Sequence, residues 1–308
     1  MPELIACNLC GCKEEVFLFE THDRLVKLPG SYRFVRCRVC GLVYVNPQPT
    51  WEERQAHYDL TGYPGYLGLK TVESTWQKRS LKYGLAKRQR LLERFLPGGR
   101  LLDVGSGVGD FPHWLRQSPQ WQVFALERLS NLAAVAHDDS DLAVIAGDLS
   151  SAGLAAGAFD GLTLWTVLEH LQDPLAGLSE CARLLRRGGI LLLRTATLES
   201  WASHLFRAYW LGYDAPRILF VFSKPLLKRY LDQTGFDLLY QGSYFHDYYP
   251  YLWSLGNWSR EASLQPRLLR LINRAAASWL ARLITHPFFW LQTQIGGDSF
   301  VTLLACKR

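Results

Sequence analysis

Short apolar runs alternate with amphipathic stretches over most of the chain after residue 100. The apolar runs predict buried strands at 100–104, 122–126, 142–146, 159–164 and 190–195, and two later ones at 236–242 and 300–306. Helical periodicity falls between them, at 110–117, 131–136 and 177–187. Strands separated by helices of this length predict an α/β fold with a parallel sheet that is covered on both faces.

The pattern changes before and within this region, and it predicts five segments. They are a cysteine-rich segment 1–50 with strand-like alternation at 32–36, a helical aromatic connector 51–96 with a basic helix at 78–95, a core 97–243, a helical aromatic insertion 244–298, and a last core strand in 299–308. A loop signal, Asn46-Pro47-Gln48-Pro49, closes the first segment, and Pro97-Gly98-Gly99 stops the basic helix.

Composition narrows the class of protein. The chain has 308 residues, of which 48% are hydrophobic and 20% charged, so it is neither disordered nor fibrous. A formal charge of +6 is too mild to select a nucleic acid, a membrane or a phosphorylated ligand. We find no apolar stretch long enough for a spanning helix and no signal-peptide pattern at the N-terminus, and therefore expect a cytoplasmic protein.

Five of the seven cysteines lie in the first forty residues. Cys7-x-x-Cys10-Gly11 and Cys37-x-x-Cys40-Gly41 form two knuckles, in which the glycine lets backbone N–H groups turn toward thiolate sulfur. Four thiolates complete a tetrahedral zinc site without an open position, so we expect a structural zinc held by Cys7, Cys10, Cys37 and Cys40. A redox dithiol is the alternative. Cys12 is surplus to the tetrahedron.

Three glycines occur at alternate positions directly after the first core strand. Gly105, Gly107 and Gly109 allow a tight turn and a close approach of backbone to ligand. A dinucleotide fingerprint would space them G-x-G-x-x-G, whereas here the third comes one residue early and Asp110 takes the last position. This favours a ligand without phosphate. A plain strand-to-helix turn is the alternative.

Two carboxylates follow the next strands. Glu127 ends the second strand about 20 residues past the loop, where a carboxylate can accept both hydroxyls of a ribose. Asp148 ends the third strand, where it can accept a hydrogen bond from an adenine amino group.

Taken in order, these residues resemble the class I S-adenosylmethionine-dependent methyltransferases. The shared features are Asp-x-Gly-x-Gly-x-Gly at 103–109, the acid Glu127, Gly147-Asp148, Phe159-Asp160, Leu168-Glu-His-Leu-Gln-Asp-Pro174 and the Gly188-Gly189 turn. The resemblance implies a Rossmann-like sheet, mostly parallel with the last strand antiparallel. It also implies that Asp103 and the three glycines shape the methionine side of the cofactor pocket. Glu127 is then expected to hold the ribose, and Asp148 and Leu149 the adenine edge. Trp165 is expected to contact the cofactor.

The match extends into the N-terminal segment. A cysteine ribbon ending at 36–49 and followed by Tyr58 and Tyr63 resembles a bacterial branch of these enzymes with an N-terminal zinc ribbon. That branch includes deoxysugar C-methyltransferases and acts on sugars, lipids and natural products. Its tyrosines after the ribbon tend to reach the cofactor, which makes Tyr58, Tyr63 and Tyr66 candidates. Aromatic packing is the alternative.

A general base is needed only if the acceptor keeps its proton until attack. His170, just past the fourth strand, is the best-placed candidate, although it can equally begin and cap the next helix. Relatives usually carry a histidine where this chain has Ile218, so a base at that position is in doubt, and His204 or His246 are substitutes. The neighbouring Arg217 can pair with an anionic substrate or with Asp214.

Residues 262–297 contain no Asp or Glu. Four arginines (267, 270, 274 and 282) fall on one arc of a helix, with apolar residues opposite. This pattern is typical of a helix that binds peripherally at the inner membrane face, and also of a lid helix packed on the sheet. Both interpretations suit an apolar or lipid-linked acceptor.

The sequence therefore predicts an S-adenosylmethionine-dependent methyltransferase (EC 2.1.1.-) that acts on a small molecule. One alternative is an RNA methyltransferase, which the lack of a dense basic stripe with interleaved aromatics makes the weaker reading. Another is a non-catalytic binding protein that retains the fold, because fold alone never proves chemistry.

Overall fold

The computed structural model describes residues 2–58, 68–69, 72, 75–137, 142–243, 247–262 and 278–308. The chain divides into two compact units that interleave along the sequence. The first contains Met1–Tyr58, Thr195–Lys228 and Gln241–Thr302, and the second contains Asp59–Arg194, Arg229–Tyr240 and Leu303–Arg308. The predicted segment boundaries at 50, 96, 243 and 298 remain predictions.

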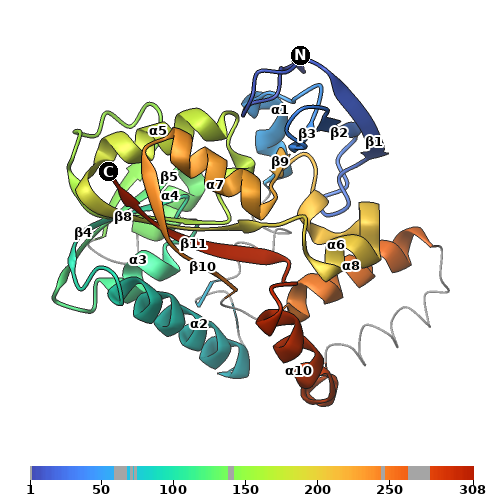
Figure 1. The fold of residues 1–308 in the computed structure, drawn as a ribbon. Helices are drawn as coiled ribbons and strands as arrows, with labels where there is room; N and C mark the ends of the chain where they lie inside the picture. The colour runs from blue at the N-terminus through green and yellow to red at the C-terminus, as the bar shows by residue number, and fades with distance from the viewer. Residues whose placement is uncertain are drawn as a thin grey trace. The chain divides into compact units, whose positions relative to one another are not determined.

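The second unit is built on a seven-stranded sheet with the order β10-β11-β8-β7-β4-β5-β6 (Figure 1). Its strands are β4 (Gly99–Val104), β5 (Trp121–Glu127), β6 (Ala143–Ala146), β7 (Phe159–Trp165), β8 (Leu185–Ala196), β10 (Phe236–Gly242) and β11 (Phe300–Lys307). The pairs β4/β5, β4/β7, β5/β6 and β7/β8 are parallel, and the last strands run antiparallel. The predicted Rossmann-like α/β fold is thereby confirmed.

Helices cover this sheet because its central strands are apolar on both faces. Leu101 and Leu102 of β4, like Leu162 and Leu164 of β7, are fully buried. The helices are α2 (Thr75–Glu93), α3 (Asp110–Leu115), α4 (Ser130–His137), α5 (Pro174–Leu184) and α7 (Lys224–Gln233). In Figure 1, α2 and α3 lie together on one side of the sheet and α5 lies on the other.

Both predicted ends of one helix are wrong by three residues. The expected helix 177–187 ends at Leu184, because Leu185 already pairs with Phe159 at the start of β8. At the other end, Asp173 caps the helix through its side chain and Pro174 takes the first helical position. The helix therefore begins three residues earlier in the chain than predicted.

The first unit contains a four-stranded antiparallel sheet with the order β1-β2-β3-β9. Its strands are β1 (Glu15–Thr21), β2 (Tyr32–Cys37), β3 (Val43–Val45) and β9 (Phe220–Val221). The last of these pairs with β3 through Val43↔Val221, although the two are far apart in the sequence. The cysteine-rich segment is followed by the short helices α1 (Trp51–Arg54) and η1 (Gln55–His57).

A buried ionic network lies within the same unit. Arg217 is fully buried and pairs with Asp23 at 2.8 Å and with Asp214 at 2.6 Å. His57 Nδ1 lies 2.6 Å from a carboxylate oxygen of Asp23, and the Arg217 guanidinium also donates to the His57 carbonyl. The sequence offered an anionic substrate or Asp214 as partner of Arg217, and the structure shows the pair with Asp214. The guanidinium thus forms ion pairs within the protein.

Three further helices of the first unit lie within the described residues: α6 (Trp201–Phe206), α8 (Tyr248–Glu261) and α10 (Trp279–Gln294). Tyr251 of α8 packs edge-on against Phe206 of α6 and Phe289 of α10. The predicted arginine arc at 267, 270 and 274 lies outside the described residues. Among the described helices, none has both the length and the apolar character required to cross a membrane.

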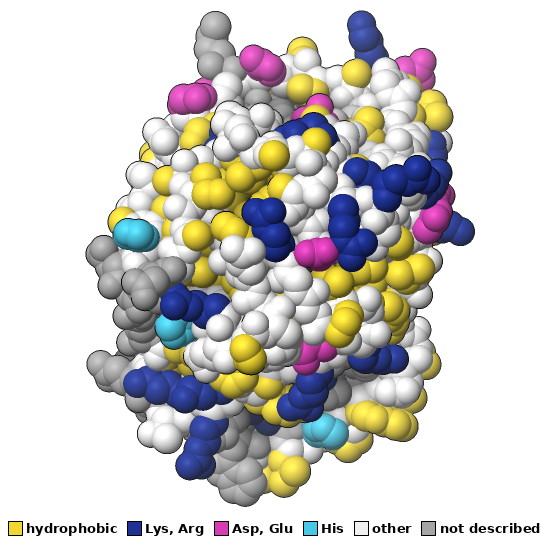
Figure 2. Space-filling model, turned by 90° about the vertical axis from the view of Figure 1, so that its left-hand side faces the viewer, with side chains coloured by type: hydrophobic (Ala, Val, Ile, Leu, Met, Phe, Trp, Pro, Cys, Tyr) yellow, Lys and Arg dark blue, Asp and Glu magenta, His cyan; other side chains and the backbone are white. Residues whose placement is uncertain are grey.

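Charged side chains are dispersed on the surface that Figure 2 displays. Lys and Arg side chains occur singly or in small groups, with apolar and uncharged atoms between them.

Candidate functional site

Four strands of the second unit bring the predicted cofactor residues together at one edge of the sheet. Asp103 lies near the end of β4, Glu127 ends β5, Trp165 ends β7, and Asp148 with Leu149 follows β6. Neighbouring parallel strands end on the same side, so these residues share the carboxyl edge, where open α/β sheets bind their ligands. Their roles as cofactor ligands remain predictions.

The glycine loop has the backbone conformation that its sequence predicts. Gly105, Gly107 and Gly109 have φ angles of 66°, 58° and 82°, which side chains other than glycine adopt only with strain. A Cβ at Gly105 would lie 2.6 Å from Val167, and one at Gly109 would lie 2.9 Å from Ala136. At Gly107 no atom of the described residues lies within 4 Å of that position. The middle glycine therefore leaves open space beside the loop.

Glu127 bridges the loop and the start of the next helix. Its Oε2 accepts a hydrogen bond from the Gly107 N–H at 2.8 Å, and its Oε1 accepts one from the Leu129 N–H at 2.9 Å. Burial raises the pKa of this carboxyl, against the effect of these hydrogen bonds. The backbone N–H of Arg128 is a third donor to this carboxylate. A carboxylate has about four lone-pair sites, so Glu127 can accept about one more donor, such as a ribose hydroxyl.

Asp103 is the most deeply buried acid of the site. Burial raises its pKa to about 7, although Thr163 donates a hydrogen bond to its carboxylate and the charge of Arg88 is nearby. Carboxyls with pKa values this far from their ordinary range occur mainly where a protein binds charged ligands or performs chemistry.

Two buried polar atoms beside the loop have no hydrogen-bond partner within the described part of the chain. They are Ser106 Oγ and the indole Nε1 of Trp165. A buried polar group without a partner is costly, and it is usually satisfied by a ligand or water. The open space at Gly107, the remaining acceptor site of Glu127 and these two atoms together fit a bound nucleoside such as that of S-adenosylmethionine.

Asp148 is already engaged on both sides. Its Oδ1 accepts hydrogen bonds from the Ser150 N–H and hydroxyl, and its Oδ2 pairs with Arg128 at 3.0 Å. The side chain is thus held in one orientation next to buried Leu149. Arg128 directly follows Glu127, so the ion pair ties the ends of β5 and β6 together.

Arg88 of α2 is a site residue that the sequence did not reveal. Its guanidinium lies 4.7 Å from the centre of the Trp165 ring, and Phe111 packs edge-on against the same ring. Burial lowers the pKa of Arg88, and the carboxylates of Asp103 and Asp110 oppose that effect. Nothing in the sequence distinguishes Arg88 from the solvated arginines of the same basic helix, such as Arg90.

His170 ends the short helix η3 (Leu168–His170), which follows β7 directly. The turn into it contains Thr166 at φ 55°, an unusual conformation for a threonine, and its N–H donates to the Arg194 carbonyl. The structure therefore places the predicted base in the same unit as the cofactor residues, just past the carboxyl end of β7.

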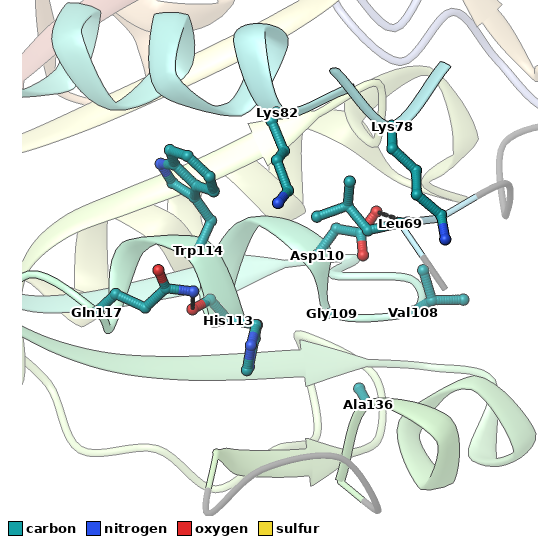
Figure 3. A pocket seen from close by; sticks show the side chains of 10 residues that line it. All are labelled: Leu69, Lys78, Lys82, Val108, Gly109, Asp110, His113, Trp114, Gln117 and Ala136. Carbon is teal, nitrogen blue, oxygen red and sulfur yellow. Dashed lines mark hydrogen bonds between the residues drawn. The ribbon is translucent and has the colours of Figure 1, made fainter. Parts of the chain in front are cut away.

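A cavity of about 400 Å³ adjoins the glycine loop (Figure 3). Lys78 and Lys82 extend from α2 toward the loop, and the carboxylate of Asp110 accepts a hydrogen bond from the Leu69 N–H at 2.9 Å. The lining is completed by Val108 and Gly109 of the loop, by Ala136, and by His113, Trp114 and Gln117. This mixed-charge cavity can accept a small polar group.

The roles of the other predicted residues remain predictions. Tyr58 belongs to the first unit, where its hydroxyl donates to the Arg217 carbonyl at 3.4 Å. Tyr63, Tyr66 and His246 lie outside the described residues. His204 is exposed on α6, and Ile218 is buried.

The four predicted zinc ligands converge in the first unit. The sulfur atoms of Cys7, Cys10, Cys37 and Cys40 all lie within 4.8 Å of one another, with Cys7–Cys40 at 3.4 Å and Cys10–Cys37 at 3.6 Å. Sulfurs at about 2.3 Å from a tetrahedral zinc would be about 3.8 Å apart, so the cluster fits this metal. Cys12 lies aside, where its sulfur accepts a hydrogen bond from the Glu14 N–H.

Both knuckles use a glycine at positive φ. Gly11 and Gly41 have φ angles of 69° and 80°, and their N–H groups donate to the carbonyls of Cys7 and Cys37. This repeated turn brings each pair of sulfurs to one side.

A family model described as a methyltransferase domain matches residues 76–241, more than half of the chain. Among curated proteins, the chain is 29% identical over 179 residues to a demethylmenaquinone methyltransferase of Beutenbergia cavernae, a match that covers 58% of this chain and 70% of that one. It is 40% identical over 106 residues to a ubiquinone biosynthesis O-methyltransferase of Xanthomonas campestris, covering 32% and 44%. The chain thus spans less than half of the second relative.

Among solved structures, the fold is similar to a SAM-dependent methyltransferase from Archaeoglobus fulgidus. The TM-score is 0.50 at 16% identity, and the match covers 73% of this chain and 94% of that one. At such low identity the likeness concerns the fold alone.

Proposed function

Since the chain belongs to the methyltransferase-domain family and is an S-adenosylmethionine-dependent methyltransferase, we propose that it methylates a small-molecule acceptor. Sugars, lipid-linked intermediates and natural products are the acceptor classes that the sequence resemblance suggests. The names of the two curated relatives refer to menaquinone and ubiquinone, which supports the lipid-linked class.

The observation that carries the proposal is the position of Glu127. Its carboxylate is fixed beside the glycine loop by the N–H groups of Gly107, Leu129 and Arg128, and about one acceptor site remains for a ligand. We propose that Glu127 holds the ribose, that Asp148 and Leu149 hold the adenine edge, and that Trp165 and Ser106 donate to the cofactor.

S-adenosylmethionine supplies a methyl group on a positively charged sulfur. Transfer is an in-line displacement, so the residues of this chain act mainly by alignment. The ionised carboxylate of Asp103 would attract the cationic methionine end, and Arg88 would hold Trp165 in place. We assign His170 to proton removal from the acceptor, because it is the described histidine that follows β7 at the carboxyl edge.

We further propose a structural zinc ion bound by Cys7, Cys10, Cys37 and Cys40. The supporting observation is that four cysteine sulfurs lie within 4.8 Å of one another. We also propose that the protein is cytoplasmic and in peripheral contact with the inner membrane face through 262–297, where a lipid-linked acceptor would be found.

An RNA acceptor is the second candidate. The surface displayed in Figure 2 has separate basic groups rather than a continuous stripe, which favours a small molecule.

Calorimetric titration with S-adenosylmethionine tests the cofactor site. We expect the Glu127→Ala variant to bind at least tenfold more weakly, because it loses the contact to the ribose and the carboxylate that fixes the glycine loop. The matched control is Asp160→Asn, at the opposite end of β7, where the carboxylate accepts from the Arg100 N–H. Equal affinity of the Glu127 variant and the wild type would refute this site.

The acceptor class is tested with a tritiated methyl donor and bacterial extracts. We expect label in the organic phase, unchanged by nuclease treatment. Label that disappears after nuclease treatment would identify RNA as the acceptor, and the absence of any labelled product alongside tight cofactor binding would indicate a binding protein.

A further inference from the structure

The outer side of α10 is apolar. Seven large hydrophobic side chains on it are between 43% and 69% exposed: Leu280, Leu283, Ile284, Phe288, Trp290, Leu291 and Ile295. At about 100° per residue they fall within an arc of about 160°, together with Pro287. We call this set the α10 face. Monomeric proteins rarely expose a contiguous apolar surface of this kind without a partner.

The side of α10 that packs inward is mixed: Phe289 is buried against the rings of Tyr248 and Tyr251, and the other inward contacts are polar. Gln292 is fully buried and donates to the carboxylate of Asp247 and to the Gly297 carbonyl. Arg282 donates to the Tyr249 hydroxyl at 3.0 Å and lies over the rings of Tyr248 and Tyr249. A helix at a water interface normally has its apolar stripe inward.

The α10 face continues onto α6. Trp201 packs against Phe288 with ring centres 5.7 Å apart, and Leu205, one turn further along α6, is exposed. Two helices of the first unit thus present one apolar surface.

We propose that the α10 face docks on the surface of an anionic phospholipid membrane. Residues 262–297 contain four arginines and no acid, so this segment of the sequence carries a net positive charge that negative lipid headgroups attract. Arg282 itself lies on the opposite side of α10, and the other three arginines lie outside the described residues. Trp290 and Phe288 are residue types that settle at the level of the headgroups. The arrangement is that of an interfacial helix lying in the membrane plane.

A second copy of the chain suits the α10 face less well. A helix of 16 residues is about 24 Å long, and with Trp201 and Leu205 the surface comprises about ten side chains. Stable protein interfaces use about 20–30 residues from each partner. An interfacial helix needs no such area, because lipid adapts to its shape.

Membrane docking of the α10 face is independent of the proposed methyl transfer. Only its use, which is access to a lipid-linked acceptor, rests on the proposed function. The test of docking therefore uses the full chain without methyl donor or acceptor, in flotation with vesicles of phosphatidylcholine and phosphatidylglycerol. The variant Leu283→Ser/Ile284→Ser removes two of the most exposed side chains of the α10 face. The matched control, Leu4→Ser/Leu239→Ser, removes leucines that are 79% and 50% exposed elsewhere.

We expect the wild type and the control to float with the vesicles, more strongly at low salt and with more phosphatidylglycerol, and the α10 variant to partition at least tenfold less. Equal recovery of the α10 variant and the wild type would overturn the proposal. So would a concentration-dependent dimer, detected by ultracentrifugation, that only the α10 variant loses, because a second copy would then cover this face. Neither result would affect the proposed methyl transfer, which the cofactor titration tests separately.

Discussion

Among single residues, Asp103 is the one whose protonation should control cofactor binding. Burial raises its pKa to about 7, so the carboxyl is largely neutral at pH 6 and ionised at pH 8. S-adenosylmethionine is cationic and is attracted by the ionised form. We therefore expect the affinity of the wild type to rise by up to about tenfold between pH 6 and pH 8, a change of about 1.4 kcal/mol.

The comparison with Asp103→Asn isolates this group from titration of the ligand and of the neighbouring Glu127. At pH 8 calorimetry should show about tenfold weaker binding for this variant, and its affinity should vary less with pH than that of the wild type. The Asp160→Asn variant should keep the wild-type slope. Parallel slopes for Asp103→Asn and the wild type would contradict the assignment.

Asp23 predicts an effect on stability rather than on binding. Burial alone would raise its pKa, but hydrogen bonds from Arg217 and His57 outweigh burial and lower the pKa to about 2. An acid whose pKa is lowered on folding stabilises the protein above its unfolded pKa of 3.8, and this contribution disappears as the pH falls toward 2. The difference corresponds to about 2 kcal/mol.

Replacing Asp23 by Asn leaves the buried Arg217 with one carboxylate fewer. We expect the unfolding free energy of this variant at pH 7 to be about 3 kcal/mol lower than that of the wild type. Between pH 4 and pH 3 the unfolding free energy should fall less in the variant than in the wild type, because the variant lacks the titrating carboxyl. Urea denaturation at these pH values measures both quantities. Asp237→Asn, which removes an exposed ion pair with Arg308, should change neither by more than about 0.5 kcal/mol.

At the scale of elements, we expect the stability of the N-terminal sheet to depend on β9, a two-residue strand that comes from a distant part of the sequence. Phe220 is fully buried and stacks with Tyr44 of β3 and with Phe222. We expect Phe220→Ala to lower the free energy of unfolding by about 4 kcal/mol, as large-to-small core substitutions do. Protease cleavage within 2–58 should become faster.

Phe17→Ala on β1 is the matched control, because Phe17 is half exposed. It should lower the unfolding free energy by less than about 1 kcal/mol and leave the cleavage pattern unchanged. If both variants were equally stable, β9 would contribute nothing to this sheet.

Local patterns predict elements well where each element is long enough to have a pattern. All seven strands of the large sheet were predictable within a few residues, except that β8 begins earlier, at Leu185. By contrast, β9 has two residues, and its pairing with β3 depends on contacts between distant parts of the chain, which no local period reveals. The same limit applies to α10. Its sequence shows which side of the helix is apolar, but not which side packs against the rest of the protein.

The candidate site was predictable for the same reason. Glycines with positive φ and acids at strand ends are set by backbone geometry, so Gly107 and Glu127 could be found from their spacing. Arg88 could not, because its role comes from contacts with Trp165, Asp103 and Asp110 that form only when α2 packs on the sheet.

For the whole molecule, chain connectivity predicts how zinc removal and cofactor binding affect stability. The chain passes between the two units five times, after residues 58, 194, 228, 240 and 302, and β11 and α7 each contribute residues to both. Units that share elements should unfold together. We therefore expect one thermal transition, which a zinc chelator lowers by about 5–10 °C and S-adenosylmethionine raises, since ligands that bind only the native state stabilise it.

Circular dichroism at increasing chelator concentration, with and without S-adenosylmethionine, measures both shifts on one curve. Cys10→Ser should reproduce the effect of the chelator, because it removes one of the four thiolates. Cys12→Ser should not, because that sulfur lies outside the cluster. If the chelator shifted one transition and the cofactor another, the two units would be thermodynamically independent, and the zinc would stabilise only the unit that contains the four cysteines.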